Sequence, residues 1–128
     1  MSDKFTVEII SPDQTILKQD TNEVIIPSFE GQMGILNNHI PLITFLRPGI
    51  ITIKAEGEKK YYVEEGTVEF SNNNLLILTS TARDIAYLDK SKINELLQKA
   101  EADLNTQSTD KDRYVASYKL ETLKEINQ

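Results

Sequence analysis

The sequence predicts a mainly β plus α fold: an N-terminal antiparallel β-sandwich of about ten strands, followed by a C-terminal antiparallel two-helix hairpin. Two observations support this fold class. All four prolines and all five glycines lie at or before Gly66, where short apolar runs alternate with turn residues. From Asp89 onward the apolar residues instead recur every three or four positions, the spacing of one helix face. We therefore expect a β-sandwich domain at residues 1–88 and a helical hairpin at residues 89–128.

The first three expected strands are separated by clear turn signals. Phe5 to Ile10 alternates apolar and polar residues as far as Ile9, which is typical of a half-buried strand, and Ser11-Pro12-Asp13 ends this run. Residues 15–18 and 22–28 form two further extended segments.

Turn chemistry then predicts a series of hairpins. In Arg47-Pro48-Gly49 the proline presets the first central position of a turn, and the glycine supplies a positive φ at the second. We therefore expect a type II turn that joins strands at residues 43–46 and 50–54 into a hairpin. Turn residues at 55–58, 65–66 and 71–74 predict three more hairpins, which add strands at 60–63, 67–70 and 75–78. The segment 79–87 leads out of the sandwich.

Two amphipathic helices of about 15 residues are expected in the rest of the chain. Asp89 or Ser91 can cap the first helix, and Thr109, with Asp112 three residues later, can cap the second. The expected buried stripes are Ile93, Leu96, Leu97, Ala100 and Leu104 on the first helix, and Val115, Ala116, Leu120, Leu123 and Ile126 on the second. Because isolated helices of this length are marginal in water, each must pack on its neighbour, on the sandwich, or on another protein.

Composition excludes several classes of function. The 128 residues include 14 basic and 20 acidic side chains, a net charge of -6, so the basic surface that binds nucleic acid is missing. The absence of cysteine excludes disulfides, thiolate catalysis and cysteine-ligated zinc. No apolar stretch has the length of a signal peptide or a membrane span, so we expect a soluble chain that reaches a membrane only through a complex.

No catalytic, cofactor or metal site is expected. His39 is the only histidine, and the sequence has neither a cysteine for it to activate nor a G-x-S-x-G nucleophile motif. Gly31-x-x-Gly34 lacks the Lys-Ser/Thr pair of a phosphate-binding loop. The acidic pair Glu64-Glu65 lies in an expected turn, where solvated charge is the ordinary interpretation. The chain is therefore expected to be no enzyme, and His39 to hydrogen-bond within its loop or to a neighbouring subunit.

Seven motifs follow one another along nearly the whole chain. They are Val7-Glu8-Ile9-Ile10-Ser11-Pro12, Glu30-Gly31-Gln32-Met33-Gly34-Ile35-Leu36, Asn38-His39-Ile40-Pro41-Leu42-Ile43, Leu46-Arg47-Pro48-Gly49, Val63-Glu64-Glu65-Gly66-Thr67-Val68-Glu69, Leu76-Ile77-Leu78-Thr79 and Leu88-Asp89. Each fragment is weak evidence by itself, but the ordered set resembles the epsilon-subunit family of F-type ATP synthases, whose mitochondrial equivalent is called delta.

The resemblance implies a non-catalytic subunit of the rotating central stalk. In that family the sandwich binds the gamma subunit on one side and the ring of c subunits at one end, and the subunit couples proton-driven rotation to ATP synthesis. In bacterial members the hairpin can extend along gamma and inhibit ATP hydrolysis, contacting the alpha and beta subunits. The implied location is the cytoplasmic face of a bacterial inner membrane, or the matrix or stroma side in an organelle.

The resemblance also implies contact residues, carried over by position. The loop of Glu30, Gly31, Gln32 and Met33, to which Gly31 and Gly34 give backbone freedom, would face the c-ring. The strands and loop around His39, Ile40, Pro41 and Leu42 would lie near gamma. Matched by charge alone, Lys111, Arg113, Lys119 and Lys124 would form a basic edge of the second helix that contacts an acidic segment of the catalytic subunits.

One motif departs from the family. Some bacterial members bind ATP through Ile or Leu, Asp, two variable residues, Arg and Ala, whereas this chain has Leu88-Asp89-Lys90-Ser91-Lys92-Ile93. Lys92 lacks the planar fork that makes bidentate contacts, so Asp89 and Lys92 form a degenerate motif and ATP binding should be weak or absent. The alternative to a stalk subunit is a free-standing β-sandwich binding module with the helices as a lid or dimerisation arm. Such a module would need an apolar or aromatic groove.

Overall fold

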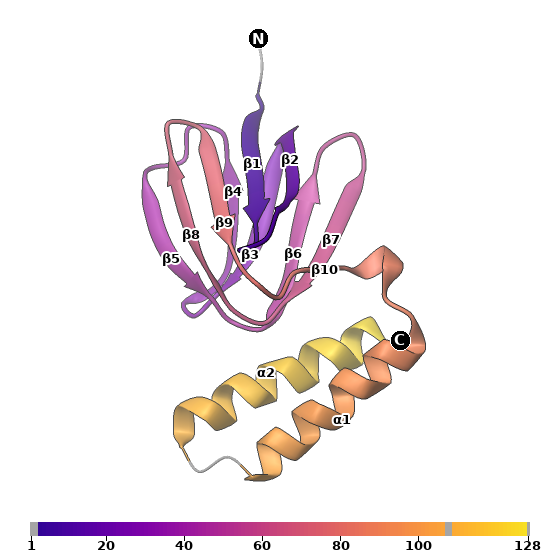
Figure 1. Cartoon of the computed structure of the whole chain (residues 1–128). Coiled ribbons are helices and arrows are strands. Elements are labelled where there is room, and N and C mark those ends of the chain that lie inside the picture. The colour runs from indigo at the N-terminus through magenta and orange to yellow at the C-terminus, as the bar shows by residue number, and fades with distance from the viewer. Residues whose placement is uncertain (1–2, 107–108, 128) are drawn as a thin grey trace.

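A computed structural model describes residues 3–106 and 109–127 and contains ten strands and two α-helices within them. The strands are β1 (Phe5–Ile10), β2 (Thr15–Thr21), β3 (Glu23–Ser28), β4 (Gly31–Leu36), β5 (Leu42–Leu46), β6 (Gly49–Lys54), β7 (Glu58–Val63), β8 (Gly66–Ser71), β9 (Asn74–Leu78) and β10 (Arg83–Asp84). The 3-10 helix η1 (Ile85–Tyr87) leads to α1 (Lys90–Thr106) and α2 (Asp110–Ile126). The strands form a sandwich, and the hairpin lies across one end of it with α2 nearer to the strands (Figure 1). Neither helix has the length and apolar character needed to cross a membrane.

The strands follow one continuous path that folds back on itself. The order is β10-β7-β6-β3-β5-β8-β9-β1-β2, with β4 paired to β3. A single bridge, Ser28 to Leu46, links β3 to β5, so the path turns there and the two halves face each other. All pairs are antiparallel except β1 with β9, which run parallel. The expected sandwich is therefore confirmed, with one parallel contact that the sequence did not reveal.

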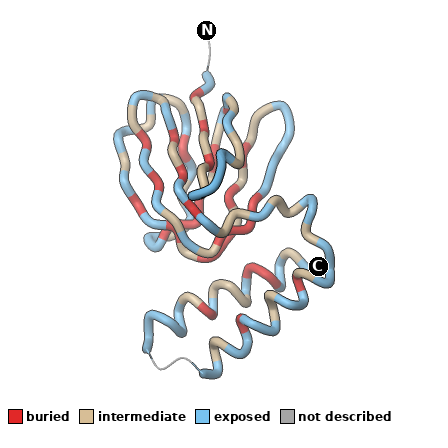
Figure 2. The backbone as a smooth tube through the Cα atoms, in the orientation of Figure 1, coloured by how far each residue is buried: buried red, intermediate tan, exposed pale blue. Residues whose placement is uncertain are grey.

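The core lies between the two halves of the sandwich (Figure 2). Strand alternation puts every second residue inside, as in β1, where Phe5, Val7 and Ile9 are buried. Thr21 and Ser28 are buried polar residues, and each hydroxyl donates to a backbone carbonyl, of Lys54 and Gly31 respectively. The sandwich core is therefore apolar, with its few polar groups satisfied.

The prediction of a hairpin at Pro48-Gly49 is wrong. β5 and β6 do not pair, because β5 joins β8 while β6 joins β3 and β7. Gly49 does not have a positive φ, so the turn is not type II. The segment instead crosses between the two halves of the sandwich, and the backbone N–H of Arg47 donates to the carbonyl of Pro27 at 2.9 Å. Local turn chemistry identified the change of direction but not the strand that β6 joins.

Two further expectations need correction. β7 and β8 do not form a hairpin at Glu65-Gly66, because each pairs with strands in a different half of the sandwich. The loop expected at Glu30 to Met33 is largely a strand, because residues from Gly31 onward belong to β4, which pairs with β3 along its whole length. The hairpins at 55–58 and 71–74 are confirmed, and Asn72 and Asn73 both take positive φ in the second.

Both helix starts are capped as the sequence predicts. The Asp89 carboxylate accepts from the N–H of Lys92 at 2.8 Å, and the Thr109 hydroxyl accepts from the N–H of Asp112 at 3.1 Å. Every residue of the two expected stripes is buried or half-buried. The helices run through 17 residues each, slightly longer than expected.

Gly49 offers a test of the packing where the chain crosses between the two halves. A Cβ at this position would lie 2.5 Å from the Cβ and 2.8 Å from the Cγ of Pro27, which cannot move away easily. We expect Gly49→Ala to lower the free energy of unfolding by about 1–3 kcal/mol through overpacking. Gly57→Ala is the matched control, since nothing lies within 4 Å of its added Cβ. Denaturant unfolding of both variants checks this, and equal midpoints would contradict the expected clash.

Candidate functional site

His39 occupies a structural position in the loop between β4 and β5. Its Nδ1 lies 2.7 Å from the carbonyl of Ile40, and its ring meets Phe70 edge-on with 5.8 Å between centroids. Asn38 takes the left-handed conformation, with φ of 63°, and exchanges hydrogen bonds with Asn73. Among the residues described, no group of three acidic or histidine side chains could hold a metal ion. His39 therefore shapes the loop and is half-buried against its own core.

Exposed apolar side chains line one face of the sandwich, formed by β5, β8, β9 and β1. We call it the outer face; its outward residues are Ile43, Phe45, Thr67, Glu69, Leu76, Leu78, Glu8 and Ile10. Ile43 and Phe45 are 75% and 59% exposed, and Ile40, just before β5, is 74% exposed. The strand register aligns Phe45, Thr67, Leu78 and Ile10 in one row across four strands. An exposed apolar row of this kind marks an interaction surface.

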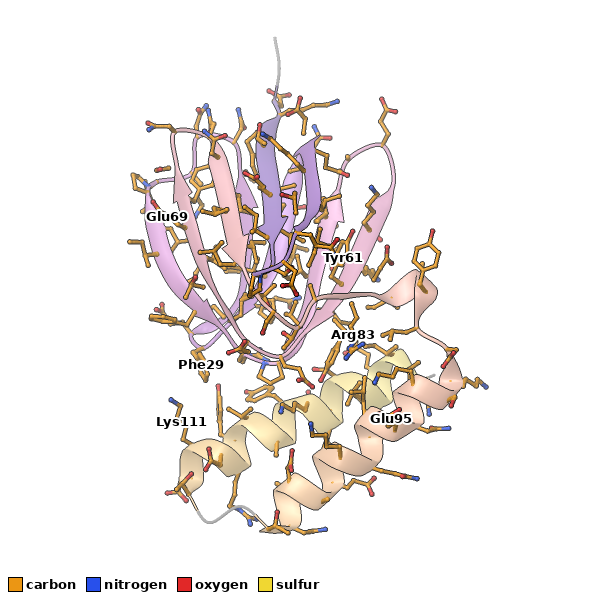
Figure 3. All side chains as sticks on the ribbon, in the orientation of Figure 1. Phe29, Tyr61, Glu69, Arg83, Glu95 and Lys111 are labelled. Carbon is orange, nitrogen blue, oxygen red and sulfur yellow. The ribbon has the colours of Figure 1, made fainter. Side chains whose placement is uncertain are left out.

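Two carboxylates stand in the next row of the outer face. Glu8 and Glu69 flank Leu76 across β1, β9 and β8, and together they border a hollow of about 220 Å³. Figure 3 shows Glu69 on the side of the sandwich near β5. Lys18 lies opposite Glu8 on β2, but neither carboxylate forms an ion pair with another described residue. A partner that covers this face can therefore place a cation beside Leu76.

The residues expected at the c-ring and at gamma lie at opposite ends of the sandwich. Glu30 is in the turn between β3 and β4, next to Phe29, whose ring stacks on Tyr114 of α2 with 5.8 Å between centroids. Gly31, Gln32 and Met33 continue into β4, where Met33 packs on the core. His39, Ile40, Pro41 and Leu42 lie at the far end. The outer face extends between the two ends.

A second, smaller apolar cluster joins the hairpin to the sandwich. Tyr62 points out of β7, away from the sandwich core, and is buried with Leu123 and Ala100 of the two helices. Partly buried residues complete this junction: Ile85, Leu88, Leu96, Leu97, Leu120 and Ile126. Six stripe residues therefore pack between the helices and against Tyr62 of β7: Leu96, Leu97, Ala100, Leu120, Leu123 and Ile126.

Polar contacts at the junction come from α2. The Tyr62 hydroxyl donates to the Glu64 carboxylate at 3.0 Å, and the Lys119 ammonium lies 4.0 Å from the other Glu64 oxygen. Burial, and then the Glu64 charge, raise the pKa of Tyr62 well above its ordinary value of 10.0. The Arg47 guanidinium sits 4.0 Å from the centroid of the Tyr118 ring. These contacts fix α2 against the strands at two places along its length.

The four cations expected on α2 do not form one edge. At 100° per residue, Lys111 and Lys119 are about 80° apart, whereas Arg113 lies about 160° from Lys111 and about 20° from Lys124. Lys119 is committed to Glu64, and Arg113 donates to the carbonyl of Leu104 at 3.3 Å. The four side chains therefore point in two directions around α2.

Asp89 and Lys92 are both engaged within α1. The Asp89 carboxylate caps the helix, and the Lys92 ammonium lies 3.3 Å from the Glu95 carboxylate. These contacts account for both residues without a ligand.

An open groove separates the first half of α2 from the end of the sandwich. It has a volume of about 1180 Å³, and most of its lining surface is apolar, although Glu64, Glu65 and Lys111 also border it. Phe29, Phe45, Leu46, Leu78 and Ile10 form its sandwich side, and Val115 and Lys111 of α2 form the other side. Figure 3 shows Phe29 and Lys111 on the two sides of this space.

The outer face and the groove were not predicted from the sequence. Residues 42–46 read Leu-Ile-Thr-Phe-Leu, and only one residue of this run is polar. A strand with apolar residues on both faces is covered on both sides, so this run carried the signal for a partner. The groove had no such signal, because it depends on where α2 comes to rest.

Residues 4–85 match the family model described as "ATP synthase, Delta/Epsilon chain, beta-sandwich domain". The ATP synthase epsilon chain of Pelagibacter ubique (strain HTCC1062) is 49% identical over 130 residues, covering 99% of this chain and all of the relative. A chain of the Euglena gracilis mitochondrial ATP synthase (OSCP/F1/c-ring, rotational state 1) shares the fold with a TM-score of 0.76 at 23% identity, over 97% of this chain and 79% of that one. A chain from the central stalk and c-ring structure of Tetrahymena thermophila mitochondrial ATP synthase has a TM-score of 0.65 at 17% identity, over 96% of both chains. The chain therefore belongs to the ATP synthase delta/epsilon family.

Proposed function

We propose that this chain is a non-catalytic rotor subunit of the ATP synthase central stalk, which helps couple proton-driven rotation of the c-ring to ATP synthesis. The single observation that carries this proposal is the match over the full length to an ATP synthase epsilon chain. The exposed apolar side chains of the outer face support it, because a chain that works alone would not leave Ile43 and Phe45 uncovered.

The outer face is the proposed contact with the gamma subunit. It begins at the His39–Leu42 loop and continues along β5 to the apolar row at the other end of the sandwich. Glu8 and Glu69 call for a basic side chain on gamma, whose aliphatic stem can pack on Leu76. Glu30 and Gln32, the exposed members of the set at the opposite end, are the proposed contacts with the c-ring.

The chain is associated with a membrane through the complex. Its proposed location is the cytoplasmic face of a bacterial inner membrane, or the matrix or stroma side in an organelle. No catalytic role is proposed, and ATP hydrolysis and synthesis are assigned to the other subunits.

The hairpin is proposed to be a separate, regulatory domain that begins at Asp89. If it inhibits ATP hydrolysis, α2 must leave its junction with Tyr62 and offer its cations to the alpha and beta subunits. Release breaks the Lys119–Glu64 pair and exposes Lys119 near Lys111 on one side of α2, while Arg113 and Lys124 lie on another side. ATP hydrolysis by complexes reconstituted with residues 1–88 or with the full chain tests this, and equal rates would leave the hairpin as a packing element.

Co-assembly tests the main proposal. The full chain is expected to co-purify with a complex of alpha, beta and gamma subunits that lacks it, and to restore coupling of that complex to the c-ring. A chain that stays unbound, while a known epsilon chain binds in parallel, would refute the proposed function.

ATP binding by the isolated chain is expected to be weak or absent. Asp89 caps α1 and Lys92 pairs with Glu95, so neither is free for a nucleotide without losing these contacts. Calorimetric titration with Mg-ATP measures this, with Asp89→Asn as a comparison. Micromolar affinity for the wild-type chain would contradict the expectation.

A further inference from the structure

We propose that the groove between the sandwich and α2 holds an apolar segment of the same partner that covers the outer face. This inference rests on the proposed function, in which that partner is the gamma subunit. The segment would contact the ends of β5 and β9 on one side and Val115 and Lys111 of α2 on the other.

The groove is kept open by the contacts that dock α2. Tyr114 stacks on Phe29 and meets the Tyr118 ring at 4.7 Å between centroids, while Arg47 covers Tyr118 from the sandwich side. Arg47 is itself held in place, because its Nε donates to the carbonyl of Ser28 at 3.0 Å. These bulky rings separate the helix from the strands, so Val115 cannot close onto Leu78 and Phe45. The groove is therefore accessible to a segment from outside the chain.

The groove is continuous with the outer face. Phe45, Thr67, Leu78 and Ile10 form the apolar row of that face, and all four also line the groove. A partner element that lies along this row therefore already lies against the groove. Burying the apolar row and the groove together removes more apolar surface from water than either alone.

Charge favours a segment of gamma over two other possible occupants, a second copy of this chain and an anionic lipid surface. A second copy of this chain would place Glu8 and Glu69 against the acidic surface of a molecule with a net charge of -6. An anionic lipid surface would meet the same carboxylates. Lys111, at the α2 side of the groove, forms no ion pair with another described residue. Glu64 and Glu65 also line the groove, but Glu64 is paired with Lys119 and Glu65 accepts from the Ser80 hydroxyl. The segment that fits is therefore apolar, with its acidic residue beside Lys111 and away from Glu64 and Glu65, on a partner that brings a cation to Glu8 and Glu69.

Partner binding and hairpin docking must then be coupled. Because α2 supplies one side of the groove, the segment binds the docked hairpin better than the released one. By linkage, the bound partner stabilises the docked hairpin by the same factor. Gamma would then disfavour release of the hairpin for as long as its segment remains in the groove.

Affinity of full-length variants for the complex of alpha, beta and gamma subunits tests this inference. Lys111→Glu and Val115→Ser are each expected to weaken binding about tenfold, since each removes a groove contact on α2 without touching the outer face. Lys99→Glu, an exposed charge reversal on α1, is the matched control and should bind like the wild type. Hydrogen exchange gives a second measurement: residues 110–118 should become more protected when the complex binds.

The outcomes separate the two proposals. If the wild-type chain does not bind, the proposed function fails. If the wild type binds and both α2 variants match it, or if residues 110–118 gain no protection, the groove is not occupied by gamma and this inference is overturned. Weaker binding by both α2 variants, together with protection of residues 110–118, supports it.

Discussion

Replacing Tyr62 with alanine is expected to release the helical hairpin while the sandwich stays folded. Tyr62 is fully buried between β7 and the helices, whereas its neighbours Tyr61 and Val63 point into the sandwich core. Removing a buried aromatic side chain costs about 3–5 kcal/mol, and here the whole cost falls on docking of the hairpin. Isolated helices of this length are marginal, so the loss should exceed what the remaining contacts supply. Amide hydrogen exchange should show α1 and α2 unprotected and the strands unchanged.

Three comparisons make this result specific. Tyr87→Ala removes an 86% exposed ring of the same type and should leave the hairpin protected. Tyr62→Phe removes only the hydroxyl that donates to Glu64, so it should weaken docking by about 1 kcal/mol. Raising the pH above 10 should also weaken docking of the hairpin. The pKa of Tyr62 is raised in the docked state, so its neutral hydroxyl stabilises docking fully at a pH below 10, the ordinary tyrosine value, and this stabilisation is lost as the pH rises further. Strands that lose protection together with the helices would show that the sandwich depends on the hairpin.

Local patterns predicted the elements better than their partners. The stripes of both helices and the caps at Asp89 and Thr109 were correct, because these features depend on residues within one turn of each other. Pro48-Gly49 marked a real change of direction, but its type and the pairing of β6 depend on the close approach of Gly49 to Pro27, which is distant in sequence. The strand β4 was missed because Gly31 and Gly34 suggested a loop, although only Gly31 needs its positive φ.

The functional surfaces show the same contrast between features that depend on local sequence and features that depend on distant residues. For His39 the sequence predicted a hydrogen bond within its loop or to a neighbouring subunit, and the structure shows its ring edge-on against Phe70. The acidic hollow required the register of three strands, including the parallel pair β1 and β9, which no local pattern reveals. The four cations expected to form one basic edge of α2 point in two directions, because they were grouped by charge and not by their positions around the helix. The groove required the resting place of α2, which is set by rings on both sides of it.

The double substitution of Ile43 and Phe45 with aspartate is expected to abolish binding to the complex of alpha, beta and gamma subunits. Both side chains point to solvent from β5, so the change leaves the core intact and acts only on a partner. Central apolar contacts in an interface are worth about 2 kcal/mol or more each. The two together therefore predict a loss of at least about 1000-fold in affinity, more if the new carboxylates are buried without partners. Quantitative pull-down or calorimetry with the purified complex measures the loss.

The matched control places the same charge on a different exposed apolar residue. Tyr87→Asp changes a side chain on η1, across the molecule from β5 (Figure 1), and should bind like the wild type. Thermal unfolding of the double variant should match the wild type, which shows that the loss is not caused by misfolding. Charge supplies a further distinction: Glu69→Lys should weaken binding and make it less dependent on salt, because it removes the attraction to a cation on gamma. If the double variant binds as tightly as the wild type, gamma contacts another face of the sandwich, and the exposed residues Ile43 and Phe45 of β5 need a different partner.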